Sequence, residues 1–421
     1  MPERHFPVRP DLRQLKHQAK DLLRAFRRSE PQAVADFLKY LQTPIDPGAA
    51  KLADAQFVLA RSYGLPHWPR LVTACRMTDA IWRGDVATVR ALVLQDSQLL
   101  HEDARGVESN WGPPMSYAAN LGKNAVIEML RSLGAKDLHY AFLRASLQGQ
   151  VETVRRLHSM MGNPHPSDDA LSGPAYTLNV ACTELLLELG ARVRDENGNR
   201  LAPVDVVLET DSRNPDAKHR ILELYAEYGL ELPDTPTMAL HRGRLDLLEE
   251  HLRRDPKLLS RTFSFGEIYP PEMGCHDEVM ATHGTPLAGA TLLHMCADYD
   301  EIEIARWLLT HGMNADEAAS TDGEGFGGHT ALFSTVVSQA NFWINHRKEV
   351  PAAPFAKLLL DHGANPNARA SLRKQLHPGY RIDGLHAYRD VTPIRWGEDF
   401  VFQKLVNPAA IRLIAEHGGQ R

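Results

Sequence analysis

Apolar residues return every three or four positions through most of the chain, a spacing that predicts amphipathic helices. In the clearest stretch, residues 291–309, two apolar runs flank one short polar break. Four other predicted second helices follow a glycine: Gly84, Gly122, Gly149 and Gly243. Two antiparallel helices joined by so short a turn need a residue at positive φ, which glycine adopts without steric cost. We therefore predict recurring two-helix units from about residue 79 onward, with Asp300 replacing the glycine at 291–309.

Most of the predicted second helices also end at a glycine. In three of them a histidine precedes that glycine: His311, His362 and His417. An imidazole in the last helical turn can bond to the unpaired carbonyl groups there and meets the negative end of the helix dipole. We interpret these three histidines as helix caps.

The segment Thr291-Leu292-Leu293-His294 resembles the threonine-proline-leucine-histidine opening of ankyrin repeats, with Leu292 in place of proline. Residues 330–332 and 392–394 match that opening in part, and residues 362–367 resemble the closing run of a repeat. The resemblance covers about residues 79–421. It implies an all-α ankyrin-repeat solenoid of about nine degenerate repeats, and a structural role for His294. The motif indicates the fold and does not identify a ligand.

Residues 1–75 have a different pattern, with predicted helices at 10–28, 31–42 and 51–62. They are followed by a Gly-Leu-Pro-His-Trp-Pro-Arg-Leu segment at 64–71, and the whole stretch resembles the N-terminal region of some bacterial ankyrin-repeat proteins. Repeat arrays need a cap over their exposed terminal face. We predict an N-terminal helical cap at 1–75 and a solenoid at 76–421; a separate docking module is the alternative for 1–75.

Composition narrows the class of protein further. Hydrophobic residues make up 43% of the 421 residues and charged residues 24%, as in folded globular proteins. The net charge is −6 and no basic stripe is sustained, so we expect no nucleic-acid partner. There is no apolar run of about 18 residues to span a membrane and no apolar signal segment at the N-terminus. The four cysteines do not suggest a disulfide framework, and we expect a cytoplasmic protein.

Four segments are longer than the short connections of regular ankyrin repeats, and we call them fingers one to four. They are residues 95–116, 260–290, 314–329 and 366–392. Insertions in a solenoid usually emerge on one face. Fingers two, three and four come from consecutive repeats, so we expect them to be neighbours.

The favoured interpretation is a binding module that holds a protein segment or a polar small molecule between concave helices and fingers. Aromatic and arginine side chains dominate binding hot spots, which selects as candidate ligand-binding residues Trp111, Phe265, Tyr269, Phe326, Tyr380, Tyr388 and Arg389. The alternative is an enzyme on the same scaffold that uses acid, base or metal-ligating groups. Its candidate catalytic residues are Glu267, His276, Asp277, His283, His377 and His386.

Residues 275–278, Cys-His-Asp-Glu, together with His283 gather several potential metal ligands in finger two. They lack the spacing that places ligands on one side of a metal ion, so we predict no metal site. No phosphate-binding loop or nucleophile elbow is present, and we predict no cofactor.

Overall fold

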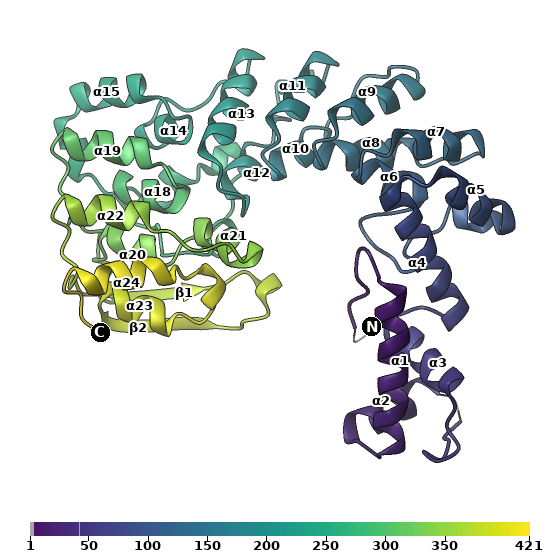
Figure 1. Cartoon of the computed structure of the whole chain (residues 1–421). Helices are drawn as coiled ribbons and strands as arrows, with labels where there is room; N and C mark the ends of the chain where they lie inside the picture. The colour runs from purple at the N-terminus through teal and green to yellow at the C-terminus, as the bar shows by residue number, and fades with distance from the viewer. Residues whose placement is uncertain (1–3, 42) are drawn as a thin grey trace. The chain divides into compact units, whose positions relative to one another are not determined.

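The computed structural model describes residues 4–41 and 43–421 and is mostly helical (Figure 1). It forms two compact units, one ending at His165 and the other comprising Pro166–Arg421. None of the described helices combines the length and the apolar character needed to cross a membrane.

The first unit begins with three helices that pack around one apolar core. They are α1 (Leu12–Arg27), α2 (Pro31–Tyr40) and α3 (Leu52–Ser62). The predicted helices therefore exist within two residues of the expected bounds, except that position 42 lies outside the described residues. Phe26 and Phe37 stack in this core with ring centroids 3.7 Å apart. The next helix, α4 (Trp68–Arg83), runs without a break through residue 75, where we placed the domain boundary.

Three helix pairs complete the first unit. They are α4 with α5 (Val86–Gln95), α6 (Pro114–Asn120) with α7 (Asn124–Ser132), and α8 (Leu138–Leu147) with α9 (Val151–Met160). A short 3-10 helix, η1 (Ser97–Leu100), follows α5. Gly84, Gly122 and Gly149 all have positive φ between the paired helices, as predicted.

The second unit continues with helix pairs. They are α10 (Ser172–Tyr176) with α11 (Val180–Glu188), α12 (Val204–Glu209) with α13 (Pro215–Glu227), α14 (Pro236–His241) with α15 (Leu245–Arg254), α18 (Leu292–Tyr299) with α19 (Ile302–Thr310), α20 (Ala331–Val336) with α22 (Pro354–Asp361), and α23 (Pro393–Asp399) with α24 (Pro408–Glu416). Helices α14, α18, α20 and α23 contact one another in that order and form an inner row (Figure 1).

The predicted features of the helix ends, a residue at positive φ between paired helices and a histidine cap, are present in this unit. Asp300 has φ 60° between α18 and α19, where glycine stands in other pairs. His311, His362 and His417 each place Nδ1 2.8 Å from the carbonyl oxygen four residues earlier, which confirms their capping role. His294 accepts a hydrogen bond from the amide of Thr291 and lies 2.9 Å from the carbonyl oxygen of His329, so it bridges turns.

The longer connections also carry regular structure, which sequence periodicity did not predict. Finger two contains α16 (Phe265–Ile268), η3 (Pro271–Met273) and α17 (Glu278–Ala281), preceded by η2 (Pro256–Ser260). An extra helix, α21 (Gln339–Arg347), lies between α20 and α22, and η5 (Gln403–Leu405) lies between α23 and α24.

The expectation of an all-α fold is wrong at finger four, which contains β-strands. It is an antiparallel hairpin of β1 (Ala370–Gln375) and β2 (Leu385–Val391), with η4 (Pro378–Tyr380) in the connection. Lys374 is paired with His386, and a bulge interrupts the register near Ala370. The hairpin forms because alternate residues of β1, among them Leu372 and Lys374, turn inward and are buried. The alternation spans only six residues and is therefore a weak signal in the sequence.

Candidate functional site

The second unit contains a pocket of about 480 Å³ where finger two and finger four meet. Other walls come from α10, from the end of α12 with the chain that follows it, and from α21. The lining residues are Tyr176, Val206, Glu209, Thr210, Asp211, Met280, His283, Phe342, His377, Gly379 and Tyr380. We call it the Asp211 pocket.

The position of Asp211 is fixed by its neighbour Arg213, whose side chain is only 2% exposed. Arg213 donates to the Asp298 carboxylate of α18 at 3.0 Å and to the Gln339 side chain of α21 at 2.7 Å. It also donates to the carbonyl oxygens of Leu208 and Thr210 at the end of α12. One buried guanidinium thereby holds the segment that carries Asp211 against two other helices.

The Asp211 carboxyl group accepts weak hydrogen bonds through a single oxygen. Its Oδ1 lies 3.3 Å from Nε2 of Gln339 and 3.5 Å from the hydroxyl of Tyr380, both of which donate to it. The backbone carbonyl of Asp211 accepts a hydrogen bond of 2.7 Å from the indole of Trp343. Burial raises the pKa of Asp211 above its ordinary value, against the opposing effect of Arg213.

His283 of finger two lies against Asp211, with its Nε2 3.7 Å from Oδ1 and its side chain 8% exposed. Its ring makes edge contacts with Tyr380 at 4.8 Å and with His377 at 6.0 Å. Burial, aided by the positive charges of Lys374 and Arg213, lowers the pKa of His283 to about 3. Within the described residues its Nδ1 has no hydrogen-bond partner. His283 is therefore a neutral imidazole whose Nδ1 is unused.

Finger four contributes His377 and Tyr380 from the turn around η4. The Nδ1 of His377 accepts a hydrogen bond of 2.9 Å from the amide of Gly379, which orients the imidazole. The Tyr380 ring packs on Phe402 at 4.8 Å, and burial beside Asp211 raises the pKa of its hydroxyl. These contacts hold the aromatic wall of the pocket in place.

Of the six candidate catalytic residues, the structure brings His283 and His377 together. His276 reaches the pocket indirectly: its amide and its Nδ1 lie 2.6 Å from the two carboxylate oxygens of Glu209, which raises the pKa of His276. The other three lie elsewhere. Glu267 pairs with Arg261 and caps α16, Asp277 caps α17, and His386 lies on β2.

Of the seven candidate ligand-binding residues, only Tyr380 lines the Asp211 pocket. Tyr269 is fully buried and stacks on Phe265, and Tyr388 packs edge-on against Trp396. Arg389 lies over the ring of Phe326, 4.2 Å from its centroid. The seventh, Trp111, belongs to the first unit and packs near Tyr117. Most of these aromatic side chains therefore support their own segments.

Sequence reasoning missed Tyr176, Asp211 and Phe342. Tyr176 ends α10, Asp211 follows α12, and Phe342 lies on α21, so none belongs to a finger. A signal did exist near Asp211. The turn between α12 and α13 carries Asp-Ser-Arg-Asn at 211–214 and lacks the glycine that connects four of the other helix pairs.

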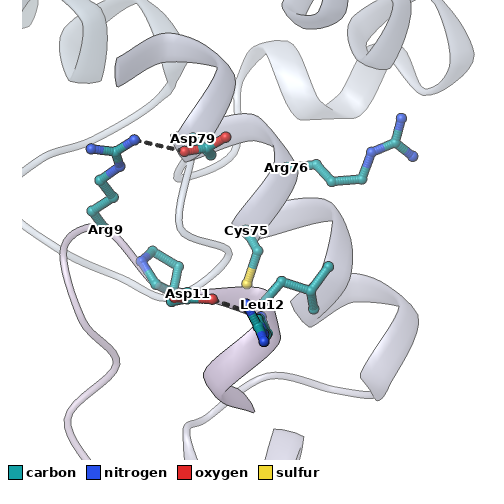
Figure 2. A pocket seen from close by; sticks show the side chains of 8 residues that line it. Arg9, Asp11, Leu12, Cys75, Arg76 and Asp79 are labelled. Carbon is teal, nitrogen blue, oxygen red and sulfur yellow. Dashed lines mark hydrogen bonds and ion pairs between the residues drawn. The ribbon is translucent and has the colours of Figure 1, made fainter. Parts of the chain in front are cut away.

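A second pocket, of about 530 Å³, lies in the first unit near the start of α1 and the middle of α4 (Figure 2). Arg9 and Asp79 form an ion pair of 2.8 Å there, and Arg76 points away from the other labelled side chains. Cys75 is buried, which raises the pKa of its thiol to about 12 and leaves it unreactive at neutral pH. None of the candidate functional residues lines this pocket.

Among the described residues, no three His, Cys, Asp or Glu side chains are grouped so as to hold a metal ion. The potential ligands of finger two are separated by their other duties: His276 binds Glu209, and Asp277 caps a helix. Cys275 is half-buried, and burial raises the pKa of its thiol.

Comparison with known proteins identifies one repeat by its sequence. The ankyrin-repeat family model matches residues 288–322, which contain α18 and α19. The comparison with curated proteins finds no match. Among solved structures, the chain is similar to the human ASB11 ankyrin repeat domain, with 14% identity and a TM-score of 0.28, over 73% of this chain and 99% of that one. The family match falls on the helix pair whose opening contains His294.

Proposed function

We propose that the second unit is a protein-binding module of the ankyrin type, and that the Asp211 pocket holds part of an extended protein segment. Ankyrin repeats are generally protein–protein interaction modules, and the family match lies in this unit. The helix pairs of the chain would then be degenerate members of one repeat series of about nine. A cytoplasmic location and a capping role for residues 1–75 remain predictions.

The observation that carries the proposal is the convergence of two fingers on one pocket. His283 comes from finger two and Tyr380 from finger four, and their rings are in contact beside Asp211. The pocket also exposes large side chains: Tyr176 is 54% exposed and Met280 is 41% exposed. Exposed aromatic and methionine side chains around a concave site are the usual anchors of a protein interface.

Catalysis is the alternative function. A carboxyl with a raised pKa beside an imidazole with a lowered pKa is a pattern found in active sites. However, a general base works best with a pKa near the working pH, and that of His283 is about 3. Its Nε2 is also too far from Asp211, at 3.7 Å, for a hydrogen bond that orients the ring. These two features favour binding over acid–base chemistry.

A matched pair of variants tests the binding function. Nine-residue random peptides displayed on phage would be selected on the full chain, and their affinities measured for Tyr176→Ala and Tyr228→Ala. Both tyrosines are about half exposed in the second unit, but only Tyr176 lines the pocket. We expect Tyr176→Ala to weaken binding by about tenfold, the loss typical of an interface anchor. Equal affinities for both variants would contradict the proposed site.

A further inference from the structure

The charges around the Asp211 pocket do not balance. Three basic groups near the pocket each have a carboxylate of their own: Arg213 pairs with Asp298, Lys374 with Glu278, and His276 with Glu209. In the described part of the chain, the only basic side chain within 4.0 Å of the Asp211 carboxylate is His283. Because that imidazole is neutral at ordinary pH, it cannot supply the missing positive charge. Asp211 therefore lacks a basic partner of its own.

The lining of the pocket has the same bias. Glu209 and Asp211 are acidic, and none of the eleven lining residues is lysine or arginine. The Asp211 side chain is 29% exposed, and only its Oδ1 takes part in the hydrogen bonds to Gln339 and Tyr380. Oδ2 therefore remains open to a hydrogen-bond donor that enters the pocket.

Aromatic rings line the same pocket as this carboxylate. Tyr176, Phe342 and Tyr380 line the pocket from three separate elements, and the rings of Phe342 and Tyr380 meet edge-on at 6.4 Å. The face of an aromatic ring is the negative part of its quadrupole and attracts a cation. A pocket that combines a carboxylate with aromatic rings therefore favours an organic cation over an anion or a neutral group.

The buried nitrogen of His283 is an independent indication of an unfilled interaction. Its side chain is more than nine-tenths buried and lines the pocket, yet Nδ1 has no partner among the described residues. Buried polar atoms in folded proteins rarely lack a hydrogen-bond partner. In the tautomer that carries its proton on Nε2, Nδ1 is an acceptor, which a ligand bearing N–H groups would satisfy after a small shift of the ring.

We propose that the Asp211 pocket binds an organic cation, namely the ammonium or guanidinium group of a lysine or arginine in the bound protein segment. The inference rests on the proposed binding function and specifies its ligand. The cation would donate to Oδ2 of Asp211 and lie against the rings of Tyr176, Phe342 and Tyr380. A lysine or arginine is long enough to place its charge inside the pocket while the peptide backbone stays outside.

The test uses the full chain and defined peptides. Nine-residue libraries carry lysine, arginine, norleucine or glutamate at the central position, with neutral residues elsewhere. We expect the lysine and arginine libraries to bind at least tenfold more tightly than norleucine, and the glutamate library to bind least. Asp211→Asn keeps the shape and one acceptor but removes the charge, so it should abolish this preference. Glu303→Gln removes an equal charge from an exposed position on α19 and should leave it unchanged.

A second pair of variants keeps the test valid if Asp211→Asn is unstable. Tyr176→Phe retains the ring face and should preserve the preference, whereas Tyr176→Ala should reduce it about tenfold. If the norleucine and lysine libraries bind equally and Tyr176→Ala abolishes that binding, the proposed cationic ligand is refuted. The proposed binding function then stands. No binding of any library, and none of n-butylammonium, would overturn both. Binding of n-butylammonium without any library would support the cationic ligand and show that a free small molecule supplies it.

Discussion

The guanidinium of Arg213 lies 3.0 Å from the carboxylate of Asp298, and the two side chains are only 2% and 1% exposed. Arg213 also lies over the ring of Tyr299, at 4.2 Å from its centroid. This buried pair joins the turn after α12 to the inner row of helices at α18. The position of Asp211 therefore depends on an ion pair whose two residues do not line the pocket.

Replacing Arg213 should be costly because it would leave Asp298 charged and buried. We expect Arg213→Met to lower the free energy of unfolding by about 3–5 kcal/mol, the range for breaking a buried pair. Urea unfolding followed by circular dichroism measures the change. The control is Arg306→Met on α19, whose pairing with Glu303 is exposed and should be worth less than about 1 kcal/mol. Similar losses of unfolding free energy for both variants would show that the buried ion pair stabilises the fold no more than an exposed pair does.

The left-handed residue Asp300 allows a test of the turn between paired helices. At φ 60°, a side chain with a Cβ atom is strained, and aspartate tolerates this conformation better than alanine. We expect Asp300→Ala to lower the free energy of unfolding by about 1 kcal/mol and Asp300→Gly to leave it unchanged. Thermal unfolding of the wild type and the two variants measures these differences in stability. A stable alanine variant would mean that the turn relaxes to another conformation.

Local chemistry explains why the scaffold could be predicted from the sequence. Helix periodicity, a residue at positive φ and a capping histidine each depend on residues close in the chain, as at Asp300 and His311. Burial of the loop aromatics depends instead on distant partners. Tyr388 was expected to bind ligand, but its ring packs on Trp396 and its hydroxyl accepts a hydrogen bond from the amide of Val401.

The candidate site was predicted only in part for the same reason. His283, His377 and Tyr380 lie on long fingers, which made them visible as functional candidates. Asp211 lies in a short turn and reaches the pocket because Arg213 binds α18 and α21, a contact spanning 85 residues in the case of Asp298. No periodicity encodes such a contact. The polar sequence of the turn at 211–214 was the signal from which a functional role of Asp211 could have been predicted.

Four buried histidines should make the second unit sensitive to acid. Burial lowers the pKa of His283 and His294 to about 3 and that of His329 to about 4, and it lowers the pKa of His241 well below its ordinary value. In the unfolded chain these groups titrate near pH 6.5. Their stabilising effect is therefore present above pH 6.5 and is lost progressively as the pH falls below it. Near pH 5 the expected slope is on the order of 5 kcal/mol per pH unit, with uptake of about four protons on unfolding.

Urea midpoints measured from pH 7.5 to 5 would give this slope. Asp211 and Glu209 have raised pKa values and oppose the trend, but only toward the acid end of the range. His283→Phe should reduce the proton uptake by about one. A pH-independent midpoint would show that the buried histidines are protonated in the folded state.

Tyr380 and Arg389 both lie on finger four and were both expected to bind ligand, but the structure separates them. Tyr380 lines the Asp211 pocket, whereas Arg389 is exposed over Phe326. We expect Arg389→Ala to change neither the melting temperature nor peptide affinity appreciably. Tyr380→Ala should weaken peptide binding about tenfold, and it should also destabilise the unit because the ring packs on Phe402 and His283. If Arg389→Ala weakens binding as strongly as Tyr380→Ala, the contact surface extends across the hairpin.

Binding of a cation at Asp211 should release protons. Burial raises the pKa of this carboxyl group in the free protein, and a bound positive charge lowers it again, so part of the protonated population ionises on binding. Other groups that face Asp211 do not reverse this sign. Arg213 keeps its charge, His283 is already neutral, and the hydroxyls of Tyr380 and Tyr176 remain protonated. Calorimetric titration of the lysine library in buffers of different ionisation enthalpy, between pH 7 and 5.5, measures the release. We expect it to grow as the pH falls and to diminish strongly in Asp211→Asn. Proton uptake in the wild type would mean that the ligand group entering the pocket is not a cation.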